Sequence, residues 1–235
     1  MTSKFVLLCL IMLAAATCKN GKNLPSDPTD ENAESPLETA DTLPAPEPEP
    51  DVINGPYKAI DLGLSVRWCD CNIGAQKPWD SGLYFAWAET TGHIPADSHS
   101  FSANSYSQNF LDADMPLSLD AAKEYLRGQW RVPTGEQMDE LCSLTWTWIP
   151  SGTKEYGGVA GVRVEGRNGN YIFLPASGYY EHTDLYKNGS RGYYWSSTFD
   201  HTGHARYLLF GSGAHLVQYE SKWCGFPIRA VYPKN

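Results

Sequence analysis

A short helix is predicted by the pattern of apolar and polar positions near the middle of the chain. Thr134 and Gln137 have the spacing of a capping box, in which each side chain bonds the backbone N–H of the other residue. Met138, Leu141 and Cys142 follow at helical spacing, so they share one face of the helix. We therefore expect this helix to lie with its apolar face against a sheet.

Most of the remaining pattern alternates with the period of a strand. Leu64, Val66 and Trp68 alternate with polar residues, and the turn-forming pairs Asn168-Gly169 and Gly211-Ser212-Gly213 separate strand candidates. The expected strands are 58–61, 65–69, 162–164, 171–174, 193–198, 205–210, 215–220 and 226–231. The first strand is free to pair with the last one.

A second helix is expected over Leu119–Arg127, with Ser118 as its cap and Gly128 as its stop. Its inward residues should be Ala122, Tyr125 and Leu126. The segment Ala88–Pro116 is polar and irregular, which is typical of a long surface loop. Two short helices and an antiparallel set of strands predict an α+β domain.

The N-terminal residues 1–17 have the pattern of a lipoprotein signal peptide. Lys4 precedes an apolar run, Phe5–Ala16, that is too short to span a bilayer. Ala15-Ala16-Thr17-Cys18 resembles a lipobox, in which cleavage precedes Cys18 and the cysteine is lipidated. The alternative is ordinary cleavage after Ala16, which would leave Cys18 as an unmodified thiol.

Residues 18–56 have the composition of a disordered linker. They contain half of the prolines in the chain and nine acidic residues but few large apolar side chains. The Pro-Glu repeat at the end of this segment predicts a stiff, extended spacer. A folded domain should follow over residues 57–235, where all eight tryptophans occur.

The formal net charge of −9 falls mostly on the linker. The domain itself is mildly acidic and has no basic stripe, so the sequence predicts no nucleic-acid partner. Nothing in the domain favours an anionic membrane surface either, and contact with a membrane is expected only through the lipid anchor.

Several ordered blocks of the domain resemble the major paralogous domain family abbreviated FISUMP. The blocks are Trp130–Gln137, Leu141–Trp148, Ile60–Trp68, Cys71–Ala75, Tyr84–Thr90, Gly169–Ala176 and Gly192–Ser197. The resemblance covers the chain from about Tyr57 to its end. It implies a C-type-lectin-like fold on an exported, outer-membrane lipoprotein that is exposed at the bacterial surface.

Four cysteines remain in the domain, which suits an exported protein with disulfide bonds. Cys69 and Cys71 are too close in sequence on one strand to pair well with each other. Each can pair with Cys142 or Cys224. Because the FISUMP blocks contain Cys71 and Cys142, the resemblance favours a Cys71–Cys142 bridge, with Cys69–Cys224 as the second. Buried free thiols are the alternative.

The sequence favours no catalytic residue, metal ion or cofactor. The segment Arg131–Glu136 resembles a block of the formylglycine-generating enzymes, but only Cys224 remains near the C-terminal end for thiolate chemistry with copper. Ser196 and Ser197 lack the setting of a nucleophilic serine, and His201 and His204 have no third metal ligand at a recognisable spacing. The triplets with which C-type lectins hold calcium are absent.

Aromatic residues in glycine-rich loops are the remaining candidates for a binding site. Tyr179, Tyr180, Tyr186 and Trp223 are predicted to be displayed for a ligand, because aromatic side chains stack on sugars and anchor protein interfaces. We therefore expect a non-enzymatic, metal-independent recognition module whose partner is a glycan or a protein at the cell surface. The alternatives are a structural or assembly component of a pilus-like complex and, less favoured, an oxidoreductase similar to the formylglycine-generating enzymes.

Overall fold

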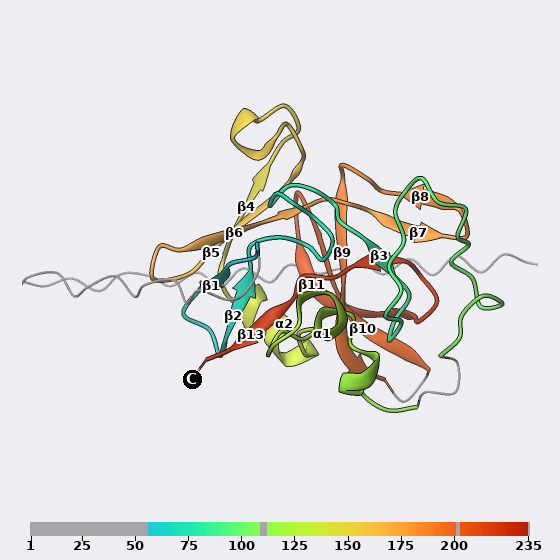
Figure 1. Ribbon diagram of the computed structural model, residues 1–235. Helices are drawn as coiled ribbons and strands as arrows, with labels where there is room; N and C mark the ends of the chain where they lie inside the picture. The colour runs from blue at the N-terminus through green and yellow to red at the C-terminus, as the bar shows by residue number, and fades with distance from the viewer. Residues whose placement is uncertain (1–55, 109–111, 201–202, 235) are drawn as a thin grey trace, which may run out of the picture. The chain divides into compact units, whose positions relative to one another are not determined.

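The structure, a computed structural model, describes residues 56–108, 112–200 and 203–234 (Figure 1). The expected signal peptide, the lipidation site Cys18 and nearly all of the linker lie outside the described residues. Those described belong to one compact unit, Glu47–Asn235. They form antiparallel sheets with two short α-helices, which confirms an α+β class in which β-structure dominates.

The strands nearest the two ends of the described chain belong to one sheet. β1 (Ala59–Asp61) and β2 (Val66–Cys69) form the expected hairpin, and β13 (Val231–Pro233) pairs antiparallel with β2. Trp68 is paired on both sides and is only 1% exposed. The predicted pairing between the N-terminal and last strands therefore forms, but through the second strand of the hairpin.

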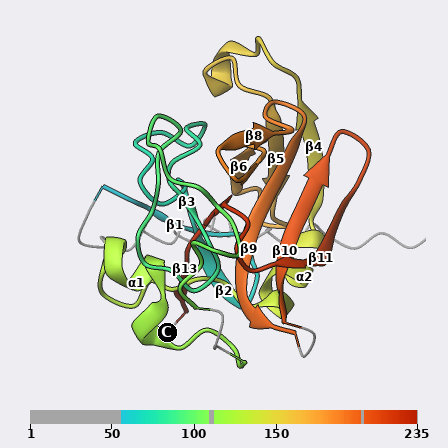
Figure 2. The same ribbon diagram turned by 90° about the vertical axis from the view of Figure 1, so that its right-hand side faces the viewer.

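The three longest strands form a second sheet in the order β11-β10-β9, and Figure 2 shows them side by side. They are β9 (Arg191–Phe199), β10 (His204–Gly211) and β11 (His215–Ser221). Gly192 of β9 lies against the ring of Phe210 in β10, with no room for a Cβ atom. All three strands were predicted, with ends within two residues of those observed.

Helix α2 (Gly135–Cys142) packs against this sheet, as predicted. Its capping box is present: Thr134 Oγ1 accepts from Gln137 N at 3.3 Å, and Gln137 Oε1 accepts from Thr134 N at 3.0 Å. Met138 and Leu141 are fully buried on its inner face. The local hydrogen bonds and the apolar stripe together determine where the helix starts and which side it buries.

Arg206 of β10 ties α2 to the sheet through two carboxylates. Its Nη1 lies 3.1 Å from Glu136 Oε1, and its Nη2 lies 2.7 Å from Asp139 Oδ2. The guanidinium occupies the space that a side chain at Gly135 would need. A side chain at Gly135 would therefore displace the guanidinium from its position against these carboxylates.

A third sheet, ordered β4-β5-β6, contains one strand that the sequence analysis missed. The predicted hairpin across Asn168-Gly169 joins β5 (Gly161–Glu165) to β6 (Tyr171–Pro175). The missed strand is β4 (Thr145–Ile149), whose tryptophans are partly buried instead of central to the core. Its Thr-Trp-Thr-Trp alternation is a strand signal that its position just after a helix concealed.

Helix α1 (Ala121–Leu126) begins later than predicted. Asp120, not Ser118, caps it, and the second carboxylate oxygen of Asp120 accepts from Val132 N at 2.9 Å. Tyr125 is 42% exposed, although it was expected to face inward. A carboxylate that bonds two segments at once is a stronger cap than a local serine hydroxyl.

The other short elements connect these sheets. They are β3 (Tyr84–Phe85), η1 (Leu117–Leu119), η2 (Lys154–Tyr156), β7 (Tyr179–Glu181), β8 (Asp184–Tyr186) and β12 (Phe226–Pro227). β12 pairs with β3, so the predicted strand 226–231 is split into β12 and β13. The expected surface loop 88–116 contains two buried rings among its described residues, those of Phe101 and Tyr106.

Candidate functional site

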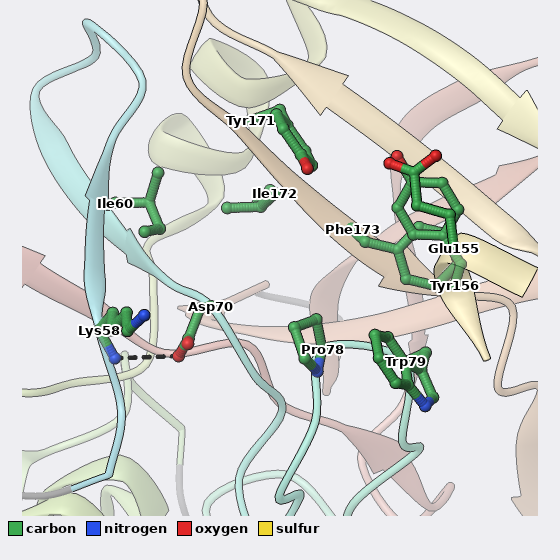
Figure 3. A pocket seen from close by; sticks show the side chains of 10 residues that line it. All are labelled: Lys58, Ile60, Asp70, Pro78, Trp79, Glu155, Tyr156, Tyr171, Ile172 and Phe173. Carbon is green, nitrogen blue, oxygen red and sulfur yellow. Dashed lines mark hydrogen bonds between the residues drawn. The ribbon is translucent and has the colours of Figure 1, made fainter.

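A pocket of about 310 Å³ opens among four segments that are distant in sequence (Figure 3). We call it the aromatic pocket. Its lining residues are Lys58, Ile60, Asp70, Pro78, Trp79, Glu155, Tyr156, Tyr171, Ile172 and Phe173. They come from the β1–β2 hairpin, the loop before β3, the 3₁₀ turn η2 and the strand β6. A volume of this size suits a small ligand.

Aromatic rings form the walls of the aromatic pocket. Tyr156 is buried and stacks on Phe173, with ring centroids 4.5 Å apart and an angle of 19° between the ring planes. Trp79 lies so close to the backbone of Gly157 that a Cβ atom there would collide with its indole ring. Gly157 also has a positive φ of 62°. The turn η2 therefore contributes Tyr156 to one wall of the pocket. The glycine that follows, Gly157, leaves the space that Trp79 occupies in another wall.

Charged groups of both signs surround these rings. Asp70 Oδ1 accepts from the backbone N–H of Lys58 at 2.9 Å. Burial and the neighbouring Glu155 carboxylate raise the pKa of Tyr156 to about 12. The hydroxyl of Tyr156 therefore stays protonated at neutral pH and can donate a hydrogen bond.

Two basic side chains lie against the pocket's aromatic faces. The guanidinium carbon of Arg163 is 4.1 Å from the ring centroid of Tyr171, and Lys77 Nζ is 5.6 Å from that of Trp79. Arg163 also pairs with Glu165. Tyr171 remains 43% exposed despite its cation. Its ring is available at the surface while its orientation is stabilised by the cation–π contact.

A buried arginine supports the floor of the aromatic pocket. Arg229 is 1% exposed, and its Nη2 donates to the carbonyl oxygen of Phe173 at 3.0 Å. Its Nη1 donates to the carbonyl oxygens of Cys69 and Asp70, both at 3.1 Å, and its Nε donates to Asn72 Oδ1 at 2.9 Å. The guanidinium therefore joins β6 to the segment that contains Asp70.

The predicted ligand-binding residues Tyr180 and Trp223 are not displayed as expected. Tyr180 is 8% exposed and packs edge-to-face on Tyr84, with centroids 4.8 Å apart. Trp223 is partly buried and packs against two hydrophobic clusters. Tyr180 is directed inward because it pairs with Leu185 in β8 and its backbone bonds Gly225. The prediction that Tyr180 is a surface residue is wrong.

Tyr179 and Tyr186 occupy the other face of the β7–β8 hairpin. Their rings stack across the two strands with centroids 5.5 Å apart, and Tyr186 is 41% exposed. Tyr179 is partly buried against Tyr193 and Phe226. None of the four predicted residues lines the aromatic pocket.

The four cysteines of the domain are free thiols in the structure, so neither predicted disulfide is formed. Cys69 and Cys224 share one hydrophobic cluster, whereas Cys142 packs against a different one at the end of α2. Burial raises the pKa of Cys69, Cys71 and Cys142 to about 12. Burial also raises the pKa of Cys224 well above its ordinary value. Cys69 and Cys224 therefore serve as small apolar residues of the core.

A second hollow of about 360 Å³ lies beside Trp146, Trp148 and the glycine-rich turn 211–214. His215 stacks on Trp146 at 4.4 Å between centroids, and its Nε2 is 3.0 Å from the carbonyl oxygen of Cys142. The residues that line this second hollow include no Asp, Glu, Lys or Arg. It therefore has fewer groups with which to orient a ligand than the aromatic pocket.

In the part of the chain that the structure describes, no group of three or more His, Cys, Asp or Glu side chains is placed to hold a metal ion. His201 lies outside the described residues, and His204 is partly buried at the start of β10. No helix within the described ranges has both the length and the apolar character needed to cross a membrane.

Sequence reasoning missed Trp79 and Tyr156, the central rings of the aromatic pocket. Each lies in a short turn-forming run, Pro78–Gly82 and Glu155–Gly158 respectively. A large aromatic residue among Pro, Gly and acidic residues is a usable signal, because a turn presents it to solvent or to another loop. A similar signal, tyrosines beside glycine-rich segments, predicts that Tyr180 is exposed, whereas the structure buries it.

One family model matches part of the chain. It is described as a domain of unknown function (DUF8237) and covers residues 163–231, from within β5 to the first residue of β13. This segment includes Tyr171 and Phe173 of the aromatic pocket but neither Trp79 nor Tyr156. No curated protein and no solved structure matches the chain. The similarity thus extends over less than a third of the sequence.

Proposed function

We propose that this protein is a non-enzymatic recognition module of an exported cell-envelope lipoprotein, and that it binds a glycan or a protein ligand in the aromatic pocket. The observation behind this proposal is the joint presence of Trp79, Tyr156 and Tyr171 around a space of about 310 Å³ with Asp70 and Glu155 at its edge. Aromatic rings supply contact area, and a few polar groups orient the ligand.

The family and cellular setting belong to the same proposal. The resemblance of the sequence blocks to FISUMP domains implies a C-type-lectin-like fold, and the pairing of β2 with β13 and the two short helices support that fold. The sequence around Cys18 supports export and lipid anchoring in the outer membrane. Cys18→Ala should then release the protein from membranes, and mass spectrometry should find a lipid on Cys18 of the wild-type chain.

Thiol-based oxidoreductase chemistry is less well supported than binding. Such chemistry requires a thiolate, and burial raises the pKa of every cysteine in the domain far above neutrality. Cys224, the cysteine nearest the C-terminal end, is also packed in a hydrophobic cluster. A buried thiol of this kind is a poor nucleophile and a poor ligand for copper.

An assembly role is the second candidate, and the edge of β11 favours it. Among the described residues, β11 pairs with β10 alone, and it carries two exposed apolar side chains, Leu216 and Tyr219, which are 39% and 53% exposed. A strand with free backbone groups and exposed apolar side chains can accept a strand from another chain. The aromatic pocket favours ligand binding more strongly because it brings four segments together.

The test of the proposed function compares variants on glycan and envelope-protein arrays. Wild-type protein should retain one or more ligands in the presence of EDTA, and Trp79→Ala should lose them while keeping a cooperative unfolding transition. Tyr219→Ala on β11 is the control and should bind like wild type. If Tyr219→Ala lost the ligand and Trp79→Ala did not, the assembly role would replace the recognition role.

A further inference from the structure

The aromatic pocket carries charges of both signs. Lys58, Asp70 and Glu155 line it, Lys77 and Arg163 lie over its rings, and Glu165 pairs with Arg163. A site that selects an ion usually presents a clear excess of the opposite charge. The mixture of signs here selects neither a cation nor an anion.

The aromatic faces argue separately against a cationic ligand. Arg163 already lies on the ring of Tyr171, and Lys77 lies over that of Trp79. A second cation at either ring would be repelled by the first, which weakens the attraction that an aromatic cage normally gives. An anionic ligand would instead meet the carboxylates of Asp70 and Glu155, at the edge of the same space.

The pocket also has apolar lining without rings, together with hydrogen-bonding groups. Ile60 and Ile172 supply that apolar lining. Glu155 and Asp70 can accept hydrogen bonds, and the ammonium of Lys58 can donate them. A ligand that fits has one apolar face for stacking and hydroxyl groups around its rim.

We propose that the aromatic pocket binds an uncharged pyranose, with its C–H face against Trp79 or Tyr171 and its hydroxyls bonded to Asp70, Glu155 and Lys58. This inference rests on the proposed recognition function and specifies its ligand class. The binding needs no metal ion, because the carboxylates contact the hydroxyls directly. Because the proposed ligand carries no charge, its affinity should also depend little on ionic strength.

The experiment is an NMR titration of the full chain with ¹⁵N-labelled tryptophan. The Trp79 indole N–H resonance is assigned with Trp79→Phe. The uncharged probes are methyl β-glucopyranoside, methyl β-galactopyranoside and methyl α-mannopyranoside. Choline is the cationic probe, and glucuronate is the anionic probe with the same ring. Each titration is run in low salt and in high salt, with EDTA present.

Matched tyrosine variants locate the site. Tyr171→Ala and Tyr219→Ala each remove an exposed strand tyrosine that has an arginine over its ring, Arg163 and Arg206 respectively. Only Tyr171 lines the aromatic pocket. At least one uncharged glycoside should shift the Trp79 resonance with saturation, at the same affinity in both salts. Tyr171→Ala should weaken that binding by about tenfold, and Tyr219→Ala should leave it unchanged.

Two results would overturn the sugar assignment without removing the recognition function. One is tighter, salt-dependent binding of choline or glucuronate. The other is a Trp79 resonance that ignores all the small probes but shifts with a protein ligand found on the arrays. If neither the probes nor any array ligand moved the Trp79 resonance, the proposed function itself would fail.

Discussion

Arg229 donates from Nη2 to the carbonyl oxygen of Phe173 at 3.0 Å, and the ring of Phe173 stacks on Tyr156 in the wall of the aromatic pocket. Arg229 therefore holds the backbone of Phe173 in β6, and the ring of Phe173 in turn packs on Tyr156 from the distant turn η2. The same guanidinium bonds the carbonyl oxygens of Cys69 and Asp70. Hydrogen bonds from Arg229 thus connect two of the segments that line the pocket.

Replacing Arg229 should destabilise the whole domain. Arg229→Met removes the donor for three backbone carbonyls and for Asn72 Oδ1, and all of these acceptors except the Asp70 carbonyl are buried. We expect a loss of about 3 kcal/mol in the free energy of unfolding, measured by urea denaturation. Arg127→Met, at a side chain 74% exposed, should change it by less than about 0.5 kcal/mol. Equal effects of the two variants would contradict the supporting role of Arg229.

Adjacent glycines allow the contact between Trp79 and the turn after Tyr156 to be measured. Gly157 and Gly158 both have positive φ, 62° and 78°, so alanine at either position costs about 1 kcal/mol in backbone strain. Only at Gly157 would the new Cβ collide with the Trp79 indole, since Gly158 has open space. We expect Gly157→Ala to shift the Trp79 indole resonance and to melt lower than Gly158→Ala. A Trp79 resonance that moved equally in both variants would show that the ring does not rest on Gly157.

Tyr180 and Tyr186 should differ in their effect on stability. Tyr180→Ala empties a buried space beside Tyr84 and Phe101 and should cost about 3 kcal/mol in the free energy of unfolding. Tyr186→Ala removes a ring that is 41% exposed and should cost less than about 1 kcal/mol. Chemical denaturation of both variants measures the difference. If Tyr180→Ala left the free energy of unfolding unchanged, Tyr180 would again be a candidate for an exposed binding residue.

A pair of stacked histidines should make the loop before Phe101 sensitive to acid. The rings of His93 and His99 lie 3.5 Å apart, and Asp97 Oδ2 is 3.1 Å from His93 Nδ1. Burial and the charge of His93 lower the pKa of His99, although the carboxylates of Glu89 and Asp97 act in the opposite direction.

Because the unfolded chain then binds a proton more readily at His99 than the folded chain does, stability is fully present above pH 6.5 and falls as the pH drops toward the lowered pKa. The protection factors of the backbone amides in residues 93–101, which correct for the slower intrinsic exchange at low pH, should therefore fall between pH 7 and pH 5. The fall should be smaller in His99→Gln, which cannot take the proton. An unchanged pH dependence in that variant would assign the effect to another group.

The thiol state of the domain has a direct test. If Cys69, Cys71, Cys142 and Cys224 are free, reductant should leave the melting temperature unchanged, and peptide mass spectrometry after alkylation in denaturant should find all four modified. In the folded protein, alkylation at neutral pH should be slow, because burial raises the pKa of each thiol. A melting temperature that fell by several degrees with reductant would restore the disulfide prediction.

Local features of this protein were determined by its sequence. The capping box of Thr134 and Gln137, the hairpin turn at Asn168-Gly169 and the long strands β9, β10 and β11 follow from contacts between near neighbours, which a linear pattern records. The α+β class follows from the same elements. Where a local signal competed with a distant one, as at Asp120 and its bond to Val132, the sequence alone predicted the wrong boundary.

The tertiary structure decided which aromatic rings meet and which are exposed. Tyr179 and Tyr180 are consecutive, yet the pairing of β7 with β8 and Gly225 buries Tyr180 and leaves Tyr179 partly exposed. Trp79 and Tyr156 become neighbours of one pocket only when the sheets are assembled around Arg229. Long-range packing of this kind depends on register and on the shape of several surfaces at once, and neither quantity is recorded in the spacing of residues along the chain.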